Sequence, residues 1–366
     1  MKSYKFKIKA SKRVQIKIEQ TLNLCRELYN SAIQERRDAW KINKISINYH
    51  DQRGQLPQIK ILRPEFKDIY SQILQDVLRR VSATFDGFFA RVRRSEKAGF
   101  PRFKNENLYS SFCYAQSGFQ IDGDKLILSK IGSVRIRQSR KMLGKIKTCI
   151  IKREVLGWFA IFTVEDEPEK LPKTNKQIGV DAGIEYFLTL SDGTQIENFK
   201  YLEKAQKQLR RAQRKVSRRV KGSNSRRKAV LKLRKIHQKI KNQRNDFSHK
   251  VSTSLVDNFD LIAIEKLNIL AMSRGFLSRQ IHDAAWNSFF LKLIYKAEYA
   301  GRQLIKVNPN GTSQVCICGA TVKKDLSVRI HLCNHCGLTE HRDIVSAKVI
   351  LKRAVGQTAE AVTWAA

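Results

Sequence analysis

Three carboxylic acids in this basic chain lie where ligands of a divalent metal ion would be expected. Asp181 lies in the apolar segment IGVDAGIEYF, Glu265 in NFDLIAIEKLNI, and Asp343 directly before IVSAKVILKRAV. Carboxylate oxygens suit Mg²⁺, and two such ions about 4 Å apart promote phosphodiester hydrolysis by activating water and stabilising the leaving oxygen. Two acids at the ends of neighbouring strands, with a third on a packed helix, therefore predict a two-metal nuclease site.

Each acid also has an ordinary structural explanation. Asp181 precedes Ala-Gly and can be a turn residue. Glu265 can form a surface ion pair with Lys266, and Asp343 can cap the last helix. The order of the three acids along a strand, hairpin, strand, helix, strand, helix pattern favours the metal site over these separate explanations.

The composition of the chain indicates a polyanionic partner. Its 366 residues include 71 Lys and Arg against 33 Asp and Glu, which gives a formal net charge of +38. A hydrophobic content of 42% argues against a disordered chain. Nucleic acid is favoured over a membrane, because no apolar run reaches the ~20 residues that a spanning helix needs. We expect a cytoplasmic, nucleoid-associated protein without a membrane partner.

The most basic segment is a predicted helical hairpin over residues 201–255 that breaks at Gly222-Ser223-Asn224-Ser225. Between Lys204 and Lys250 the only acid is Asp246. Solvated helix faces usually mix charges, so this one favours nucleic-acid contact. The loop GFPRFK (99–104) suits the same contact, although it can equally be a solvated loop. The candidate contacts are Arg102, Lys104, Arg218, Arg219, Arg226, Arg227, Arg234 and Lys241.

Four of the seven cysteines are close together in VCICGATVKKDLSVRIHLCNHCG, while the others are isolated: Cys25, Cys113 and Cys149. This distribution is typical of a reducing compartment with one metal site rather than of a disulfide scaffold. Cys333 and Cys336 have C-x₂-C spacing, whereas one residue separates Cys316 from Cys318. We expect these four thiolates to bind structural Zn²⁺, and inert buried cysteines are the alternative. Two histidines are close enough in sequence to replace a ligand: His331 and His335.

Hydrophobic periodicity divides the first half of the chain. MKSYKFKIK alternates as a strand, residues 14–97 are mostly helical with a polar break at 43–60, and residues 98–165 alternate as a small β-barrel or sheet. Residues 165–176 are acidic and contain proline, which is typical of a linker. Five aromatic residues at helical spacing are expected in the core rather than as stacking platforms: Tyr29, Trp40, Phe85, Phe88 and Phe89.

The second half begins with a strand, a turn at Ser191-Asp192-Gly193 and another strand. A buried strand ending at Glu265 follows the basic hairpin. Next comes a helix that we expect to be capped by Asp283 and to stop at Gly301. Residues 302–307 are one more strand, and residues 344–355 form a short final helix.

These motifs, in this order, resemble TnpB, the family of RNA-guided endonucleases of bacterial insertion sequences that is related to type V CRISPR effectors and Fanzor proteins. The resemblance covers nearly the whole chain. The motifs that resemble the family are IGVDAGIEYFLTLSDG, the basic hairpin, IAIEKLNI, TSQVCICGATV and CGLTEHRD, with GFPRFK and IGSVRIR in the N-terminal half.

The resemblance implies a multidomain α+β fold. A RuvC-like nuclease domain of RNase H fold would comprise residues 169–311 and 338–366, with a zinc-ribbon-like insertion at residues 312–337. An N-terminal wedge β-barrel would comprise residues 1–10 and 98–168, interrupted by a helical recognition domain at residues 11–97.

The resemblance also implies an activity. Asp181, Glu265 and Asp343 would be the catalytic Mg²⁺ ligands of a monomer carrying one guide RNA derived from the transposon end. The protein would open double-stranded target DNA beside a short adjacent motif, bind the displaced strand and cleave by two-metal hydrolysis. Base pairing would select the sequence, so the protein would hold mainly a heteroduplex backbone, in keeping with its charge.

Two positions depart from the family pattern. Val345 stands where the family usually has Asn, and the first cysteine pair lacks one intervening residue. All three acids are present, which favours an active nuclease. The alternatives are a nuclease-inactive RNA-guided DNA-binding protein or repressor, a compact type V CRISPR-associated effector, and a DDE-like transposase that joins DNA ends.

Overall fold

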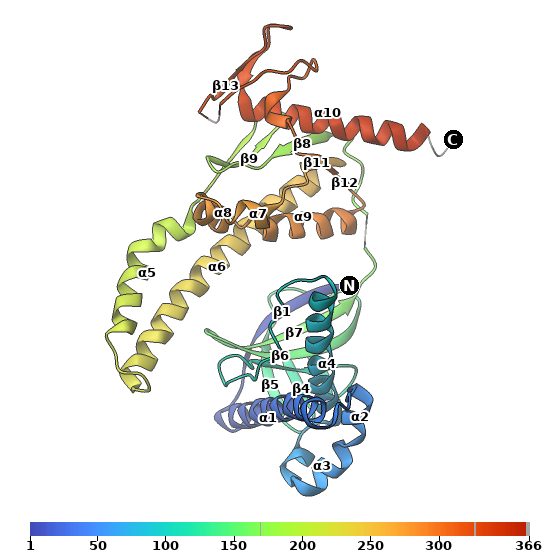
Figure 1. Ribbon diagram of the computed structural model, residues 1–366. Helices are drawn as coiled ribbons and strands as arrows, with labels where there is room; N and C mark the ends of the chain where they lie inside the picture. The colour runs from blue at the N-terminus through green and yellow to red at the C-terminus, as the bar shows by residue number, and fades with distance from the viewer. Residues whose placement is uncertain (169, 326, 364–366) are drawn as a thin grey trace. The chain divides into compact units, whose positions relative to one another are not determined.

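The computed structural model describes residues 1–168, 170–325 and 327–363, and the chain divides into two compact units (Figure 1). The N-terminal unit is Met1–Glu167 and the C-terminal unit is Pro168–Ala366. Each unit has hydrophobic clusters of its own. In the described part of the chain, every helix is too short or too polar to cross a membrane.

The N-terminal unit contains a seven-stranded antiparallel sheet with strand order β2-β6-β7-β1-β5-β4-β3. In β1, alternation buries Tyr4, Phe6 and Ile8, as the sequence predicted. The ladder has β2 and β3 at its edges, and a wedge barrel stays a prediction. The strands are β1 (Lys2–Lys9), β2 (Ser111–Tyr114), β3 (Phe119–Asp122), β4 (Lys125–Leu128), β5 (Gly132–Arg137), β6 (Lys145–Glu154) and β7 (Gly157–Glu165).

Between β1 and β2 the chain is helical. The long helices α1 (Lys12–Asn43) and α4 (Ser71–Arg93) were predicted, but the polar residues 43–60 are not simply a break. They contain α2 (Tyr49–Gly54) and most of α3 (Leu56–Leu62), which η1 (Pro64–Asp68) follows. A capping box between Asn48 and Asp51 begins α2, and buried Gln52 accepts a hydrogen bond from Arg36. These polar contacts stabilise helices that hydrophobic periodicity does not reveal.

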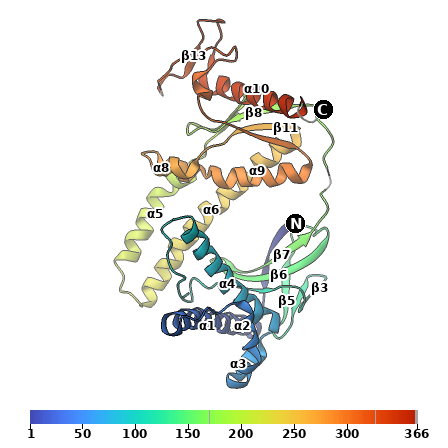
Figure 2. The same cartoon turned by 45° about the vertical axis from the view of Figure 1, so that its right-hand side comes forward.

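The C-terminal unit contains a mixed five-stranded sheet, β10-β9-β8-β11-β12, in which β8, β11 and β12 are parallel. Figures 1 and 2 show α10 on one face and α6 and α9 on the other. Ile178, Val180, Ile262 and Ile264 pack with α6 and α9, whereas Leu261 and Ala263 pack with α10. The strands are β8 (Gln177–Asp181), β9 (Tyr186–Leu190), β10 (Gln195–Glu197), β11 (Leu261–Glu265) and β12 (Gln303–Val307).

The remaining elements include the predicted helical hairpin and one correction. The helix expected from Asp283 to Ala300 is two helices, because Ala285 adopts a left-handed conformation between them and Asp283 lies in the last turn of the first. The elements are α5 (Tyr201–Ser217), α6 (Asn224–Asn258), α7 (Ile269–Met272), α8 (Ser278–Ala284), α9 (Trp286–Ala300), η2 (Thr312–Gln314), β13 (Ile330–Leu332), β14 (Thr339–His341) and α10 (Arg342–Thr363).

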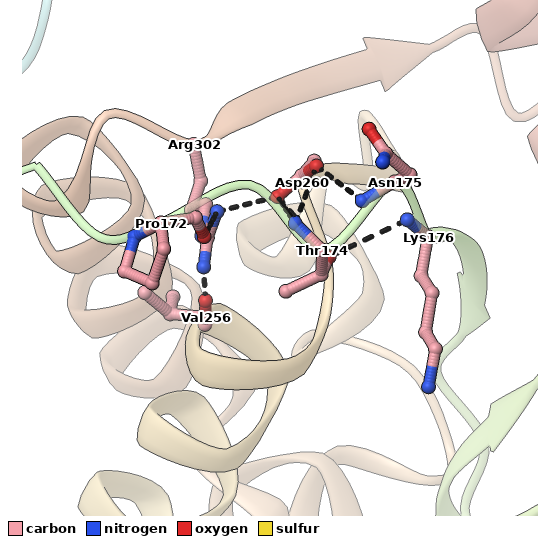
Figure 3. A network of polar contacts seen from close by, with 7 residues as sticks. All are labelled: Pro172, Thr174, Asn175, Lys176, Val256, Asp260 and Arg302. Carbon is pink, nitrogen blue, oxygen red and sulfur yellow. Dashed lines mark hydrogen bonds and ion pairs between the residues drawn. The ribbon is translucent and has the colours of Figure 1, made fainter.

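A polar network fastens the chain that enters β8 to the starts of β11 and β12 (Figure 3). Buried Arg302 pairs with Asp260 and donates to the carbonyls of Val256 and Pro172, at 2.9 Å each. The Asp260 carboxylate accepts hydrogen bonds from the backbone amides of Thr174 (2.9 Å) and Asn175 (2.7 Å). The Thr174 amide, followed by that of Asn175, holds the pKa of Asp260 below its usual range. The strand that carries Asp181 therefore begins from a fixed position.

Gly179 brings α10 into direct contact with β8. A Cβ atom at Gly179 would lie 2.0 Å from the Ala347 carbonyl oxygen and 2.9 Å from Leu351 Cβ. No side chain fits in that space, so the glycine sets the separation of helix and strand.

We expect Gly179→Ala to lower the free energy of unfolding by about 3 kcal/mol, because α10 must move off the sheet. Gly87→Ala is the matched control, since a Cβ at this helical glycine of α4 meets no atom within 4 Å. The control should be neutral or stabilising by up to about 1 kcal/mol. Urea unfolding measures both, and equal stability of the two variants would contradict the close packing.

Candidate functional site

Asp181 and Glu265 lie at the same edge and on the same face of the sheet. Val180 pairs with Ile264 in the parallel ladder, and each acid is the next residue of its strand. Because side chains alternate, Glu265 faces the same side as Leu261 and Ala263, which is the side that α10 covers. Asp181 shares its side with Gly179, which also contacts α10. Two strand ends thus direct carboxylates towards one helix.

Asp343 belongs to the first turn of that helix. It precedes Ala347 by about one turn, and the Ala347 carbonyl touches β8 at Gly179, two residues before Asp181. A carboxylate in the first turn of a helix is also favoured by the helix dipole. The packing at Gly179 therefore brings Asp343 to the edge of the sheet where Asp181 ends its strand.

Asp181 lies within the electrostatic influence of the other two acids. Burial raises the pKa of Asp181 well above its usual range, and the carboxylates of Glu265 and Asp343 raise it further. Burial also raises the pKa of Glu265, which is lowered in turn by the Thr312 hydroxyl and by Arg353. Neighbouring carboxylates in a partly buried position need a cation to ionise together, so the chemistry of these residues suits divalent metal ions. Among the described residues their oxygens do not form a group within 4.8 Å of one another, as the cysteine sulfurs do.

Thr312, which the sequence did not single out, orients one of these acids. Its buried hydroxyl donates a hydrogen bond to Glu265 Oε1. Arg353 of α10 donates to the carbonyls of Asn308 and Asn310, both at 2.9 Å, and so holds the loop that presents Thr312. The sequence does contain a signal that could have identified Thr312. This residue ends the turn sequence NPNGT, which directly follows β12, the neighbour of the strand that ends at Glu265.

The four late cysteines form a compact cluster. Their sulfur atoms all lie within 4.8 Å of one another, the one such group of three or more metal-ligand side chains in the residues described. Cys316 and Cys336 are 3.6 Å apart, and Cys318 and Cys333 are 3.8 Å apart. Bonds of about 2.3 Å at tetrahedral angles would place sulfur atoms about 3.8 Å apart, so the cluster fits Zn²⁺.

Two tight turns present these thiols in spite of the short first spacing. The Gly319 amide donates to the Cys316 carbonyl at 2.9 Å, and the Gly337 amide donates to the Cys333 carbonyl at 2.8 Å. Both glycines have positive φ, as such turns require. Hydrogen bonding from the Cys336 amide lowers the pKa of Cys333 to about 6, whereas burial raises the pKa of Cys316 to about 12. A bound cation would therefore be needed for all four sulfurs to be thiolates.

The two histidines lie outside this cluster, contrary to the prediction that they could serve as ligands. The ring of buried His331 contacts the Lys324 ammonium group through Nδ1. His335 is exposed, and its ring is not part of the group of close ligand atoms found among the described residues. Four cysteine sulfurs already complete the cluster, so neither ring is needed as a ligand.

We expect purified protein to contain about one equivalent of zinc and Cys318→Ser to contain less than about half an equivalent, because one of four ligands is lost. Cys113→Ser, in the N-terminal unit, is the control and should retain its zinc. Elemental analysis by mass spectrometry measures the content. Full retention of zinc by Cys318→Ser would show that the C-x-C pair does not bind it.

The predicted nucleic-acid contacts of the hairpin differ in their surroundings. Five of them are exposed on α5, α6 or the turn: Arg218, Arg219, Arg227, Arg234 and Lys241. Arg226 instead donates to the carbonyls of Val216 (2.8 Å) and Arg219 (3.0 Å), so it closes the hairpin. In the other unit Arg102 is exposed, whereas Lys104 lies 4.1 Å from the centre of the Tyr29 ring.

Asp283 has a role that replaces its predicted one. Its carboxylate accepts hydrogen bonds from the amides of Leu202 (3.0 Å) and Glu203 (3.2 Å), the first turn of α5. It also pairs with Arg244 of α6 at 2.5 Å. Lys200, the residue before α5, supplies no side-chain cap. Asp283 therefore caps a distant helix and joins both arms of the basic hairpin to α8.

Val345, the departure from the family pattern, is 1% exposed. It lies two residues after Asp343 and is followed by buried Ser346 and Ala347. An apolar side chain suits this position, because a buried amide would need hydrogen-bond partners.

Three family models match the chain. The OrfB_IS605 model, described as "Probable transposase", matches residues 161–275, and the "Cas12f1-like, TNB domain" model matches residues 286–350. A protein of Escherichia coli K12 named "Putative RNA-guided DNA endonuclease InsQ" is 30% identical over 96% of this chain and 92% of its own length. A "Putative RNA-guided DNA endonuclease" of Streptomyces pristinaespiralis is 32% identical over 98% of this chain and 90% of its own length. The chain belongs to the TnpB family.

Two further comparisons concern the fold of this TnpB-family chain. A "Helix-turn-helix domain" model matches residues 1–44, where the structure has β1 followed by the single long helix α1. The structure titled "mini-RNA-guided endonuclease CRISPR-Cas_phi3" aligns with a TM-score of 0.53 at 10% identity, covering 97% of this chain and 92% of that one. This likeness shows a shared mixed α and β fold.

Proposed function

We propose that this TnpB-family protein is an RNA-guided DNA endonuclease whose Mg²⁺ ligands are Asp181, Glu265 and Asp343. The observation that carries the proposal is the convergence of these acids at one edge of a sheet in a chain of net charge +38. The names of the Escherichia coli and Streptomyces relatives support the RNA-guided activity.

The C-terminal unit suits a RuvC-like nuclease domain of RNase H fold. Its sheet begins with an antiparallel meander, β8 to β10, and continues with the parallel strands β11 and β12 next to β8. We place this domain at residues 169–311 and 338–366 and the zinc-ribbon-like insertion at residues 312–337. The four cysteines would hold a structural Zn²⁺ in that insertion.

Bound Mg²⁺ would activate water and stabilise the departing oxygen. The protein residues supply position and charge. Gly179 allows α10 to bring Asp343 towards Asp181, and Thr312 fixes the orientation of Glu265. The exposed lysines and arginines of the hairpin would neutralise backbone phosphates, with Asp283 holding both arms at their base.

The partners follow from this division of tasks. A guide RNA derived from the transposon end would select the target by base pairing, and the protein would contact the duplex and the displaced single strand. Residues 1–10 and 98–168 would form a wedge domain and residues 11–97 a recognition domain. The functional unit would be a monomer with one RNA, acting at the bacterial nucleoid.

We expect Asp181→Ala to reduce cleavage of target plasmid by about three orders of magnitude or more, because a metal ligand is lost. Guide-dependent DNA binding should persist, since the basic surfaces are unchanged. Asp192→Ala, which alters an exposed turn acid between β9 and β10, is the control and should cleave normally.

Three results would contradict this assignment. Undiminished cleavage by Asp181→Ala would exclude Asp181 as a metal ligand. Stable, guide-dependent binding without cleavage by the unaltered protein would favour an RNA-guided DNA-binding protein or repressor. Joined DNA ends formed without RNA would favour a transposase.

A further inference from the structure

Four large aromatic side chains are exposed where the ends of α1 and α4 approach the loop of residues 99–104. Exposure is 58% for Trp40, 52% for Phe89, 45% for Phe100 and 46% for Phe103. We call these four residues the aromatic patch. We propose that the aromatic patch binds unpaired bases of a nucleic acid strand by stacking.

The patch corrects an expectation from the sequence. Helical spacing predicted Trp40, Phe85, Phe88 and Phe89 in the core, yet only Phe85 of these four is fully buried. The reason is that Phe85 already fills the space between the helices, where Arg36 lies 5.3 Å from its ring centre. The later aromatic residues extend beyond that contact into solvent. Large exposed aromatic side chains that lie in a group usually belong to a binding surface, because the ordinary surface of a monomer rarely exposes such groups.

Phe88 links two rings of the aromatic patch, and Arg37 links α1 to a third. Phe88 lies 5.2 Å from Phe89 and 5.5 Å from Phe100, measured between ring centres, and both pairs meet edge to face. The Arg37 guanidinium group lies 5.4 Å from the centre of the Phe103 ring, which joins α1 to the loop. Trp40 follows on the same side of α1, about one turn after Arg37.

The loop that carries two of these rings is held in place. The Asn30 side chain donates to the Lys104 carbonyl at 3.0 Å and accepts from the Lys104 amide at 2.9 Å. The Lys104 ammonium group lies over the Tyr29 ring, and Pro101 is buried. Rings held in this way lose little conformational entropy when they bind a ligand.

Charge identifies the partner. Residues 36–44 and 85–104 together contain ten lysines and arginines and three acids. A protein or a second copy of this basic chain would be repelled there unless it were acidic. Exposed rings among cations are the pattern of surfaces that bind single strands, where bases stack and phosphates meet the charges. Bases inside a duplex are already stacked, so we assign the patch to unpaired ones.

The inference rests on the proposed function only in taking nucleic acid as the partner. The patch lies in the N-terminal unit, whereas the three candidate acids lie in the other. Phe89, Phe100 and Phe103 also lie outside the residues that the family models match, which are 1–44, 161–275 and 286–350.

The test uses the full-length Asp181→Ala protein and fluorescein-labelled 15-nucleotide single strands of one sequence, as RNA and as DNA. Phe89→Leu and Phe103→Leu keep apolar bulk but remove the aromatic face. We expect each to weaken binding of one or both strands about tenfold. The dependence of affinity on salt should keep its slope, because no phosphate contact is lost. Comparing the two strands shows whether RNA or DNA is preferred.

Two controls separate stacking from general damage. Leu108→Ala removes an exposed aliphatic side chain of the same unit and should bind normally. Phe103→Tyr keeps the ring and should also bind normally. In addition, in a Trp364→Phe background, oligonucleotide binding should quench fluorescence that is lost in Trp40→Phe, since Trp158 and Trp286 are buried.

Unchanged affinity of both leucine variants would overturn the inference, as would an equal loss in Leu108→Ala. The inference would also be overturned if the leucine variants lost self-association while their affinity for the single strands stayed unchanged. The aromatic patch would then bind a second copy of the chain. Target cleavage by the same substitutions in protein that retains Asp181 is measured in parallel. Intact cleavage with unchanged single-strand affinity would show that the aromatic patch does not bind unpaired bases, and it would leave the proposed endonuclease function uncontradicted.

Discussion

The candidate site depends on one close contact, the packing of α10 directly on β8 at Gly179. The helix and the strand approach so closely that a single methyl group would collide with the Ala347 carbonyl. This contact determines how far the first turn of α10, with Asp343, lies from the strand end that carries Asp181. The network of Asp260 and Arg302 fixes the other end of β8, and Arg353 fixes the loop beside Glu265. Backbone packing thus positions the acids before any ligand binds.

Charge is separated within the C-terminal unit. At the sheet edge, burial and the carboxylates of Glu265 and Asp343 raise the pKa of Asp181, while the α5–α6 hairpin is almost entirely basic. Under the proposed function, such a site would attract divalent cations and such a hairpin would attract phosphates, so one fold would supply both requirements of phosphodiester hydrolysis. Asp283 connects the two, because it caps α5, pairs with Arg244 of α6 and lies on α8, the second helix after Glu265 along the chain. The hairpin is therefore anchored to the same unit as the acids.

Sequence patterns predicted the features that depend on local periodicity. The strands ending at Asp181 and Glu265, the basic hairpin and the grouping of four cysteines could all be recognised from apolar runs, breaks and spacing. Contacts between distant residues could not. Asp283 looked like a local cap but caps a helix 80 residues earlier, and Thr312 acts on Glu265 across 47 residues. Trp40 and Phe89 have core spacing, yet the helices end too far out to bury them.

The most direct test of the central claim is to locate the metal ions. Crystals of the protein with its RNA, grown with Mn²⁺ in place of Mg²⁺, can be measured at wavelengths that separate manganese from zinc by anomalous scattering. We expect manganese among the carboxylates of Asp181, Glu265 and Asp343 and zinc among the four cysteines. Zinc at the cysteines with no manganese at the three acids would contradict it.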